Sequence, residues 1–156
     1  MNSILSEAFY TDVTAEQKER LKSFRMMHPR EYIDLEGIAW SYVHGGQGAE
    51  TILLLPGGER IGDIGFPFLQ EFEQEYRWLY PSYPPLPTMN ALLDGLAALL
   101  DRLGIERVIL FAASFGGDVG QCFVRKYPQK VSKLILLNTG LQTSRLVGQH
   151  SLRSRW

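Results

Sequence analysis

The stretch that most constrains this chain runs from Val108 to Gly117. Four apolar residues lead into Ser114, which has a small residue two positions before it, Ala112, and another two positions after it, Gly116. An amphipathic run follows over residues 119–127. This order is typical of a strand, a tight turn and a helix, in which the serine has a strained backbone and an exposed hydroxyl. The small residues predict that the strand and the helix approach each other closely.

The helix predicted to begin near Phe115 adds a second property to this turn. Its first backbone N–H groups and the positive end of its dipole lie beside the Ser114 hydroxyl, which suits an oxygen atom that becomes negatively charged. A purely structural interpretation is that Ser114 only caps the helix. A glycine-rich loop upstream, at residues 56–58, favours the first interpretation because it can supply a further N–H donor.

The other elements alternate along the chain. Strands are predicted over residues 32–36, 38–43, 51–55, 77–80, 108–111 and 134–138, and helices over residues 14–27, 64–75, 89–103 and 115–127. The continuous apolar run at 51–55 predicts a strand buried on both faces, and the alternation at 32–36 and 38–43 predicts an antiparallel pair. The sequence therefore predicts an α/β fold with a mainly parallel, doubly wound sheet of about six strands.

Local signals predict several boundaries and surfaces. Thr14 and Gln17 form a capping box, and Leu21, Phe24 and Met27 are the expected apolar face of the first helix, which ends at His28-Pro29. Thr88 is expected to cap a helix whose leucines share one face and which ends at Gly104. Residues 44–48 are expected to form a turn. His28 and His44 are expected to lie on the surface.

Composition excludes several function classes. The chain has 156 residues, enough for one domain, and a net charge of −1, which indicates no attraction to nucleic acid or to an anionic membrane. Its only cysteine, Cys122, excludes an intramolecular disulfide and is expected to be a buried thiol. Neither a signal peptide nor a membrane-spanning run is evident, so we expect a cytoplasmic protein. Metal clusters and nucleotide-binding loops are also missing, so no cofactor is implied.

Taken together, these parts resemble the α/β-hydrolase superfamily over residues 30–140. The turn at Ser114 resembles its nucleophile elbow, with Ala112 in place of the usual first glycine. Leu55-Pro56-Gly57, the segment 80–84 and the segment 111–117 are most similar to the maspardin-like branch. The resemblance divides the chain into a lead-in and helix (1–29), a partial hydrolase domain (30–140) and a basic tail (141–156).

The resemblance implies the roles of the site residues. Ser114 would be the nucleophile towards a small ester-like substrate, and the backbone N–H groups of Phe115 and Gly58 would form the oxyanion hole. Pro56 stands where the superfamily usually has histidine, so the hydrogen bonding of that loop must differ. His44-Gly45-Gly46 resembles the oxyanion motif of some lipases, but it precedes the strand at 51–55 and is therefore a decoy.

The acid and the base that activate the serine are the weak part of this resemblance. In the superfamily they follow the serine, yet after Asp118 this chain has no Asp or Glu, and its only later histidine is His150. Asp118 is expected to favour the helix dipole. A carboxylate from before the serine, such as Glu59 or Asp63, could be recruited to orient His150. The resemblance thus implies a truncated hydrolase fold that is weakly active or inactive as given.

Two alternatives remain open at this level. The same fold could serve as a non-enzymatic binding or regulatory module, or as a half-enzyme completed by a partner chain. The apolar strand at Leu134–Leu137 would lie at the edge of the sheet, and a flat apolar edge pairs readily with another strand. We therefore expect self-association through this strand, or its cover by the basic tail.

Overall fold

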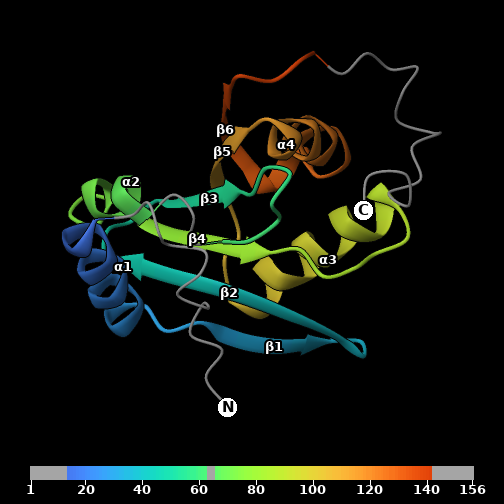
Figure 1. Cartoon of the computed structure of the whole chain (residues 1–156). Coiled ribbons are helices and arrows are strands. Elements are labelled where there is room, and N and C mark those ends of the chain that lie inside the picture. The colour runs from blue at the N-terminus through green and yellow to red at the C-terminus, as the bar shows by residue number, and fades with distance from the viewer. Residues whose placement is uncertain (1–13, 63–65, 142–156) are drawn as a thin grey trace.

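The structure of the protein is a computed structural model that describes residues 14–62 and 66–141. A six-stranded sheet lies between helices (Figure 1), and its strand order is β1-β2-β4-β3-β5-β6. The strands are β1 (Glu31–Leu35), β2 (Ile38–Gly46), β3 (Thr51–Leu55), β4 (Arg77–Ser82), β5 (Val108–Ala113) and β6 (Val131–Leu137). The helices are α1 (Ala15–Met27), α2 (Phe66–Phe72), α3 (Met89–Arg102), α4 (Phe115–Lys126) and the short 3-10 turn Pro128–Lys130.

Pairing within the sheet follows the predicted pattern. β1 with β2 and β2 with β4 are antiparallel, whereas β3 pairs in parallel with β4 and β5, and β5 pairs in parallel with β6. Every residue of β3 is buried, as its apolar run predicts. The predicted α/β fold with a mainly parallel sheet is confirmed.

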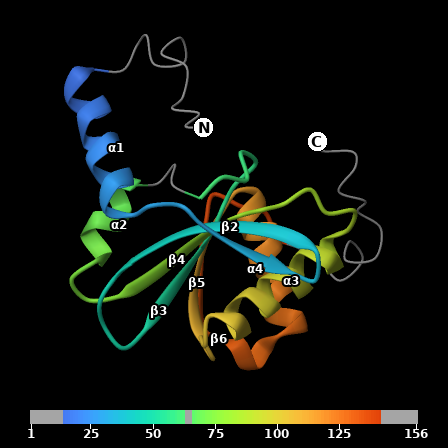
Figure 2. The same cartoon turned by 90° about the horizontal axis from the view of Figure 1, so that it is seen from below.

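Helices cover both faces of the sheet (Figure 2). α3 and α4 lie on one face, where the leucines of α3 and the Val119 and Phe123 side chains of α4 pack with the sheet in one core cluster. α1 and α2 lie on the other face, where Phe24 and Leu69 pack with Trp78 and its neighbours. This arrangement confirms the doubly wound architecture, in which parallel strands are buried on both sides.

α3 is the element that the sequence predicts best. Thr88 accepts a hydrogen bond from the Ala91 N–H at its start, and Gly104 follows its end with φ of 67°. The leucines of its predicted face are buried, namely Leu92, Leu93, Leu96, Leu99 and Leu100, and Leu103 just after its end is partly buried against the same core. Among the described residues, neither this helix nor any other is long and apolar enough to span a bilayer. A cytoplasmic location stays a prediction.

α1 begins at the predicted capping box, in which both reciprocal hydrogen bonds between Thr14 and Gln17 are present. Its apolar face is smaller than predicted, because Phe24 is buried whereas Met27 is 61% exposed. Phe24 is the buried residue of this helix, and its ring stacks on Trp78 of the sheet. The lead-in 1–13 and the tail 142–156 lie outside the described residues, so the predicted domain division stays a prediction.

The turn predicted at residues 44–48 begins later than expected, because β2 continues to Gly46, which pairs with Arg77, and the bend follows at residues 48–50. Gly45 is required there by packing: a Cβ atom on it would lie 2.7 Å from Trp78 and from the ring of His28. The surface prediction is therefore wrong for His28, whose side chain is only 12% exposed, but it is correct for His44, at 54%. Gly45 of the decoy motif thus serves the contact between His28, at the end of α1, and the sheet.

β6 lies at one edge of the described sheet, as predicted. It begins three residues earlier than expected, and an irregularity in its register lies next to the pair Val108 and Val131. Leu134 and Leu136 pack against the core on the side of α4, whereas Ile135 and Leu137 are 42% and 47% exposed. The strand is therefore apolar on both faces and covered on one.

Candidate active site

Ser114 joins β5 to α4 with φ of 51° and ψ of −126°. A non-glycine residue rarely adopts such a conformation, and it is held here because the Ser114 N–H donates to the Leu137 carbonyl oxygen at 3.2 Å. The serine occupies the N-cap position of α4, but its side chain makes no capping hydrogen bond. The interpretation of Ser114 as a mere helix cap is therefore wrong.

Small residues allow α4 to lie against the sheet at this turn, as predicted. A Cβ atom on Gly116 would lie 2.3 Å from the Leu55 carbonyl oxygen. Ala112 is fully buried, and a Cβ atom on Gly120 would lie 3.2 Å from its methyl group. The first turn of α4 consequently sits directly over the end of β3.

The glycine loop after β3 forms a second wall. Arg60 N–H donates to the Gly57 carbonyl oxygen at 3.1 Å, and the Tyr83 N–H donates to the Arg60 carbonyl oxygen at 2.9 Å. Glu59 turns back on this loop, because its Oε1 atom accepts from the Gly57 N–H at 3.0 Å. The loop is thereby closed and tied to the segment that follows β4.

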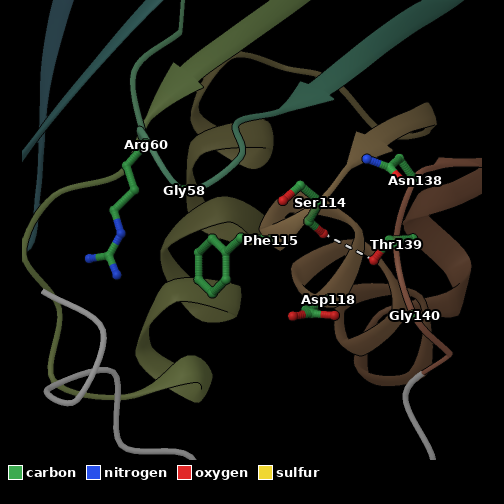
Figure 3. Close-up of a pocket in the computed structure, with 8 residues that line it drawn as sticks. All are labelled: Gly58, Arg60, Ser114, Phe115, Asp118, Asn138, Thr139 and Gly140. Carbon is green, nitrogen blue, oxygen red and sulfur yellow. Dashed lines mark hydrogen bonds between the residues drawn. The ribbon is translucent and has the colours of Figure 1, made fainter.

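The third wall comes from the residues after β6. Thr139 Oγ1 donates to the Ser114 carbonyl oxygen at 3.0 Å, the contact drawn as a dashed line in Figure 3. The buried Gln121 donates from Nε2 to the carbonyl oxygens of Gly140, at 2.8 Å, and Gly117, at 3.2 Å. These bonds fix the end of β6 to α4.

The three walls enclose a pocket of about 420 Å³ (Figure 3). Its lining consists of Gly58, Arg60, Ser114, Phe115, Asp118, Asn138, Thr139 and Gly140. Ser114, Phe115 and Gly58, which the sequence predicts to act together, are thus brought to one cavity. Their roles as nucleophile and oxyanion-hole donors stay predictions.

Backbone strain is concentrated around this pocket. Four non-glycine residues among the described ones have positive φ, and three of them line it: Arg60 (59°), Ser114 (51°) and Asn138 (46°). The fourth, Glu36, lies in the turn between β1 and β2. Strained residues cost free energy and cluster where function requires an exact arrangement. This clustering supports a functional role for the pocket.

Arg60 gives the pocket a cationic side. Its guanidinium carbon lies 5.4 Å from the centre of the Phe115 ring, a cation–π contact. Tyr83 meets the same ring edge-on, with 6.3 Å between the ring centres. Burial lowers the pKa of Arg60. Burial also raises the pKa of Tyr83 well above its ordinary value, with smaller contributions from Tyr80 and Glu59.

The predicted acid and base candidates lie in different places in the structure. Asp118 lines the pocket, and it lies in the first turn of α4, where the sequence predicts a contribution to the helix dipole. The carboxylate of Glu59 accepts a hydrogen bond from the Gly57 N–H of its own loop. His150 and Asp63 lie outside the described residues. His44 lies elsewhere, on β2 opposite Leu79, and hydrogen-bonds to Glu31.

Sequence analysis missed the contributions of Arg60, Asn138, Thr139 and Gly140 to the pocket. One signal pointed to them: they follow the carboxyl ends of the parallel strands β3 and β6. In open α/β sheets, ligands bind outside those strand ends. In the sheet, β5 lies between β3 and β6 and leads directly to Ser114, so the ends of β3 and β6 flank the serine. The sequence alone could not show this, because it does not reveal the strand order.

Comparisons with known proteins agree with this architecture. The sequence model of the alpha/beta hydrolase fold matches residues 51–152. The chain is similar to the uncharacterized hydrolase YcgS of Bacillus subtilis, at 34% identity over 114 residues, which cover 68% of this chain and 40% of that protein. It is also similar to homoserine O-acetyltransferase of Thermus thermophilus, at 44% identity over 55 residues, 35% of this chain and 14% of that enzyme.

A solved structure shows the same likeness of fold. An epoxide hydrolase from Vigna radiata superposes with a TM-score of 0.67 and 21% identity, over 74% of this chain and 41% of that one. The chain spans less than half the length of each of these three proteins. These comparisons do not confirm the narrower resemblance to the maspardin-like branch, which stays a prediction.

Proposed function

Because the chain belongs to the α/β-hydrolase fold family, we propose that it catalyses acyl transfer from a small ester-like molecule, with Ser114 as the nucleophile. One observation supports this most strongly. Ser114 holds a left-handed backbone conformation between β5 and α4, its hydroxyl is not used as a helix cap, and it lines a pocket. A serine held in this way is available to a substrate.

The proposed reaction begins when Ser114 Oγ attacks the carbonyl carbon of the ester and passes its proton to a base. The carbonyl oxygen becomes an oxyanion, which the backbone N–H groups of Phe115 and Gly58 would bind. Each such donor contributes about 3 kcal/mol to transition-state stabilisation in comparable sites. The tetrahedral intermediate then expels the alcohol, and water releases the acyl group from the serine.

The identity of the base is the open part of this proposal. None of the eight described residues that line the pocket is a histidine, and Asp118 is the one carboxylate among them. His150 follows the serine in the sequence, although the acid that the family's order places between them is missing, and it is the base that the proposal assigns to this chain. The alternatives are a base supplied by a partner chain, and a binding module without catalysis.

Labelling with a fluorophosphonate probe tests the proposal directly, because the probe modifies only an activated serine. We expect labelling of the full chain and of the control Ser23→Ala, whose serine is exposed on α1, but not of Ser114→Ala. Loss of labelling in His150→Ala would support His150 as the base.

Other outcomes separate the alternatives. Labelling that requires a second chain would indicate completion by a partner. If Ser114 is not labelled under any condition and p-nitrophenyl acetate is not hydrolysed, the enzymatic proposal is wrong and the binding module is favoured.

A further inference from the structure

The charge distribution in the Ser114 pocket points to its substrate class. We propose that the pocket binds acyl compounds that carry a carboxylate near the reacting carbonyl group, and that Arg60 binds this carboxylate. The inference rests on the proposed function, because it assumes that the reacting carbonyl lies at Ser114. It goes further by naming the chemical group that distinguishes a substrate from other esters.

Arg60 is held in place by its backbone. Its N–H donates to Gly57 and its carbonyl oxygen accepts from Tyr83, and these two bonds enclose a residue with φ of 59°. An arginine in this conformation costs free energy that glycine would not cost. Glycine occurs twice just before it, at Gly57 and Gly58, whereas this position carries a long cationic side chain in spite of the backbone cost.

The side chain of Arg60 reaches the residue next to the nucleophile. Its guanidinium lies over Phe115, which directly follows Ser114, and Tyr83 meets the same ring edge-on. In Figure 3 the Phe115 ring lies between the guanidinium of Arg60 on one side and the side chains of Ser114 and Asp118 on the other. Because the guanidinium is partly withdrawn from water, which lowers the pKa of Arg60, a carboxylate that binds it gains more than it would at an open surface.

Asp118 sets the orientation of such a ligand. It lines the same pocket, but Figure 3 places it on the far side of the Phe115 ring from Arg60. A carboxylate near Asp118 would be repelled, whereas one near Arg60 would form a paired, bidentate contact. The pocket is therefore polarised across Phe115. The ligand carboxylate lies on the side of Gly58 and Arg60, and the reacting carbonyl lies at Ser114.

A cavity of about 420 Å³ suits a small dicarboxylic half-ester. Small-molecule sites typically measure roughly 300–1,000 Å³. Monomethyl succinate carries one ester and one carboxylate, and dimethyl succinate is its neutral analogue. The two probes differ in the charge of the group that Arg60 would bind.

Binding of these probes is measured by NMR titration of the full chain carrying Ser114→Ala, so that turnover plays no part. We expect monomethyl succinate to bind at least about tenfold more tightly than dimethyl succinate, as a charge-assisted hydrogen bond implies. Arg60→Gln should abolish this preference, and Arg60→Lys should keep part of it. The control Arg102→Gln, at an exposed position in the last turn of α3, should leave it unchanged. Asp118→Asn should strengthen binding of the half-ester alone.

Two results would overturn the inference. One is equal affinity for the two probes in the parent chain. The other is an equal loss of affinity for both probes in Arg60→Gln while the amide spectrum of the protein is unchanged. Arg60 would then only support the shape of the pocket. Failure of the proposed function looks different, since Ser114 would then resist fluorophosphonate while the half-ester still binds. Labelling of Ser114 without any preference for the half-ester would contradict only the inference on Arg60.

Discussion

Glycine at position 116 is a steric requirement of the Ser114 turn. A methyl group there would lie 2.3 Å from the Leu55 carbonyl oxygen and 2.7 Å from that of Pro56, and both atoms belong to the backbone. Neither can move without shifting the glycine loop relative to α4. The residue therefore controls both the packing of the helix and the distance between the two proposed N–H donors.

We predict that Gly116→Ala lowers the free energy of unfolding by about 1–3 kcal/mol, as overpacking does elsewhere. The measurement is urea denaturation followed by circular dichroism. Gly140→Ala is the matched control, because a Cβ atom at Gly140 would meet nothing within 4 Å. An equal stability of the two variants would contradict the steric argument.

Tyr83 carries a buried hydroxyl that has no hydrogen-bond partner among the described residues. Burial of an unpaired hydroxyl costs free energy, so Tyr83→Phe should raise the free energy of unfolding by about 1 kcal/mol. Tyr42→Phe is the contrasting variant, because the Tyr42 hydroxyl donates to Glu31 Oε2 at 2.7 Å. It should lower stability by about 1 kcal/mol. Urea denaturation of both variants tests the difference, and the same sign for both would refute it.

At the scale of elements, α3 and α4 are joined by a polar contact at the edge of their apolar interface. Asp94 of α3 accepts from the Tyr127 hydroxyl and pairs with Lys126, both at the end of α4. Lys126 first and Tyr127 second hold the pKa of Asp94 below its ordinary value. Asp94 in turn raises the pKa of Tyr127 to about 12.

The pH dependence of stability follows from the sign of this shift. A carboxylate with a lowered pKa in the folded state stabilises the protein above its ordinary pKa, and this stabilisation is lost as the pH falls through the lowered value. Asp94→Asn should therefore lower stability at neutral pH by no more than about 1 kcal/mol, because the pair is largely exposed. It should also flatten the decline of stability below the ordinary pKa of 3.8.

Urea denaturation at a series of acidic and neutral pH values checks this prediction. Glu106→Gln serves as the control at an exposed carboxylate. A pH profile of Asp94→Asn that runs parallel to that of the parent chain would show that the contact contributes nothing.

At the scale of the whole molecule, the sheet has one apolar edge in its described part. β6 presents unpaired backbone groups together with the exposed Ile135 and Leu137, on the face that α1 and α2 leave open there. Pairing of two β6 strands would satisfy both the backbone groups and the apolar side chains.

We therefore predict association that increases with protein concentration, measured by sedimentation velocity. Ile135→Lys should weaken it, since a charge at the centre of the strand opposes pairing. The matched control is Ile38→Lys, at a similarly exposed position of β2. A protein that remains monomeric at high concentration would contradict the prediction.

Elements with strong local signals could be predicted in detail. The capping residues and leucine face of α3, the buried run of β3 and the small residues around Ser114 all act over a few positions of sequence. Predictions failed where a distant contact decided the outcome. The side chain of His28 is only 12% exposed because Gly45, seventeen positions later, leaves room for its ring. β2 extends to Gly46 because Arg77 pairs with it.

The candidate site divides in the same way. The sequence by itself determined the strand–turn–helix around Ser114, because apolar runs, small residues and a helix start are local constraints on the backbone. Only the tertiary structure decided what faces the serine. The strand order β3-β5-β6 brings the loops after β3 and β6 to either side of Ser114, and so places Arg60 and Thr139 in its pocket. Strand order is set by the burial of whole faces, and no short segment of sequence encodes it.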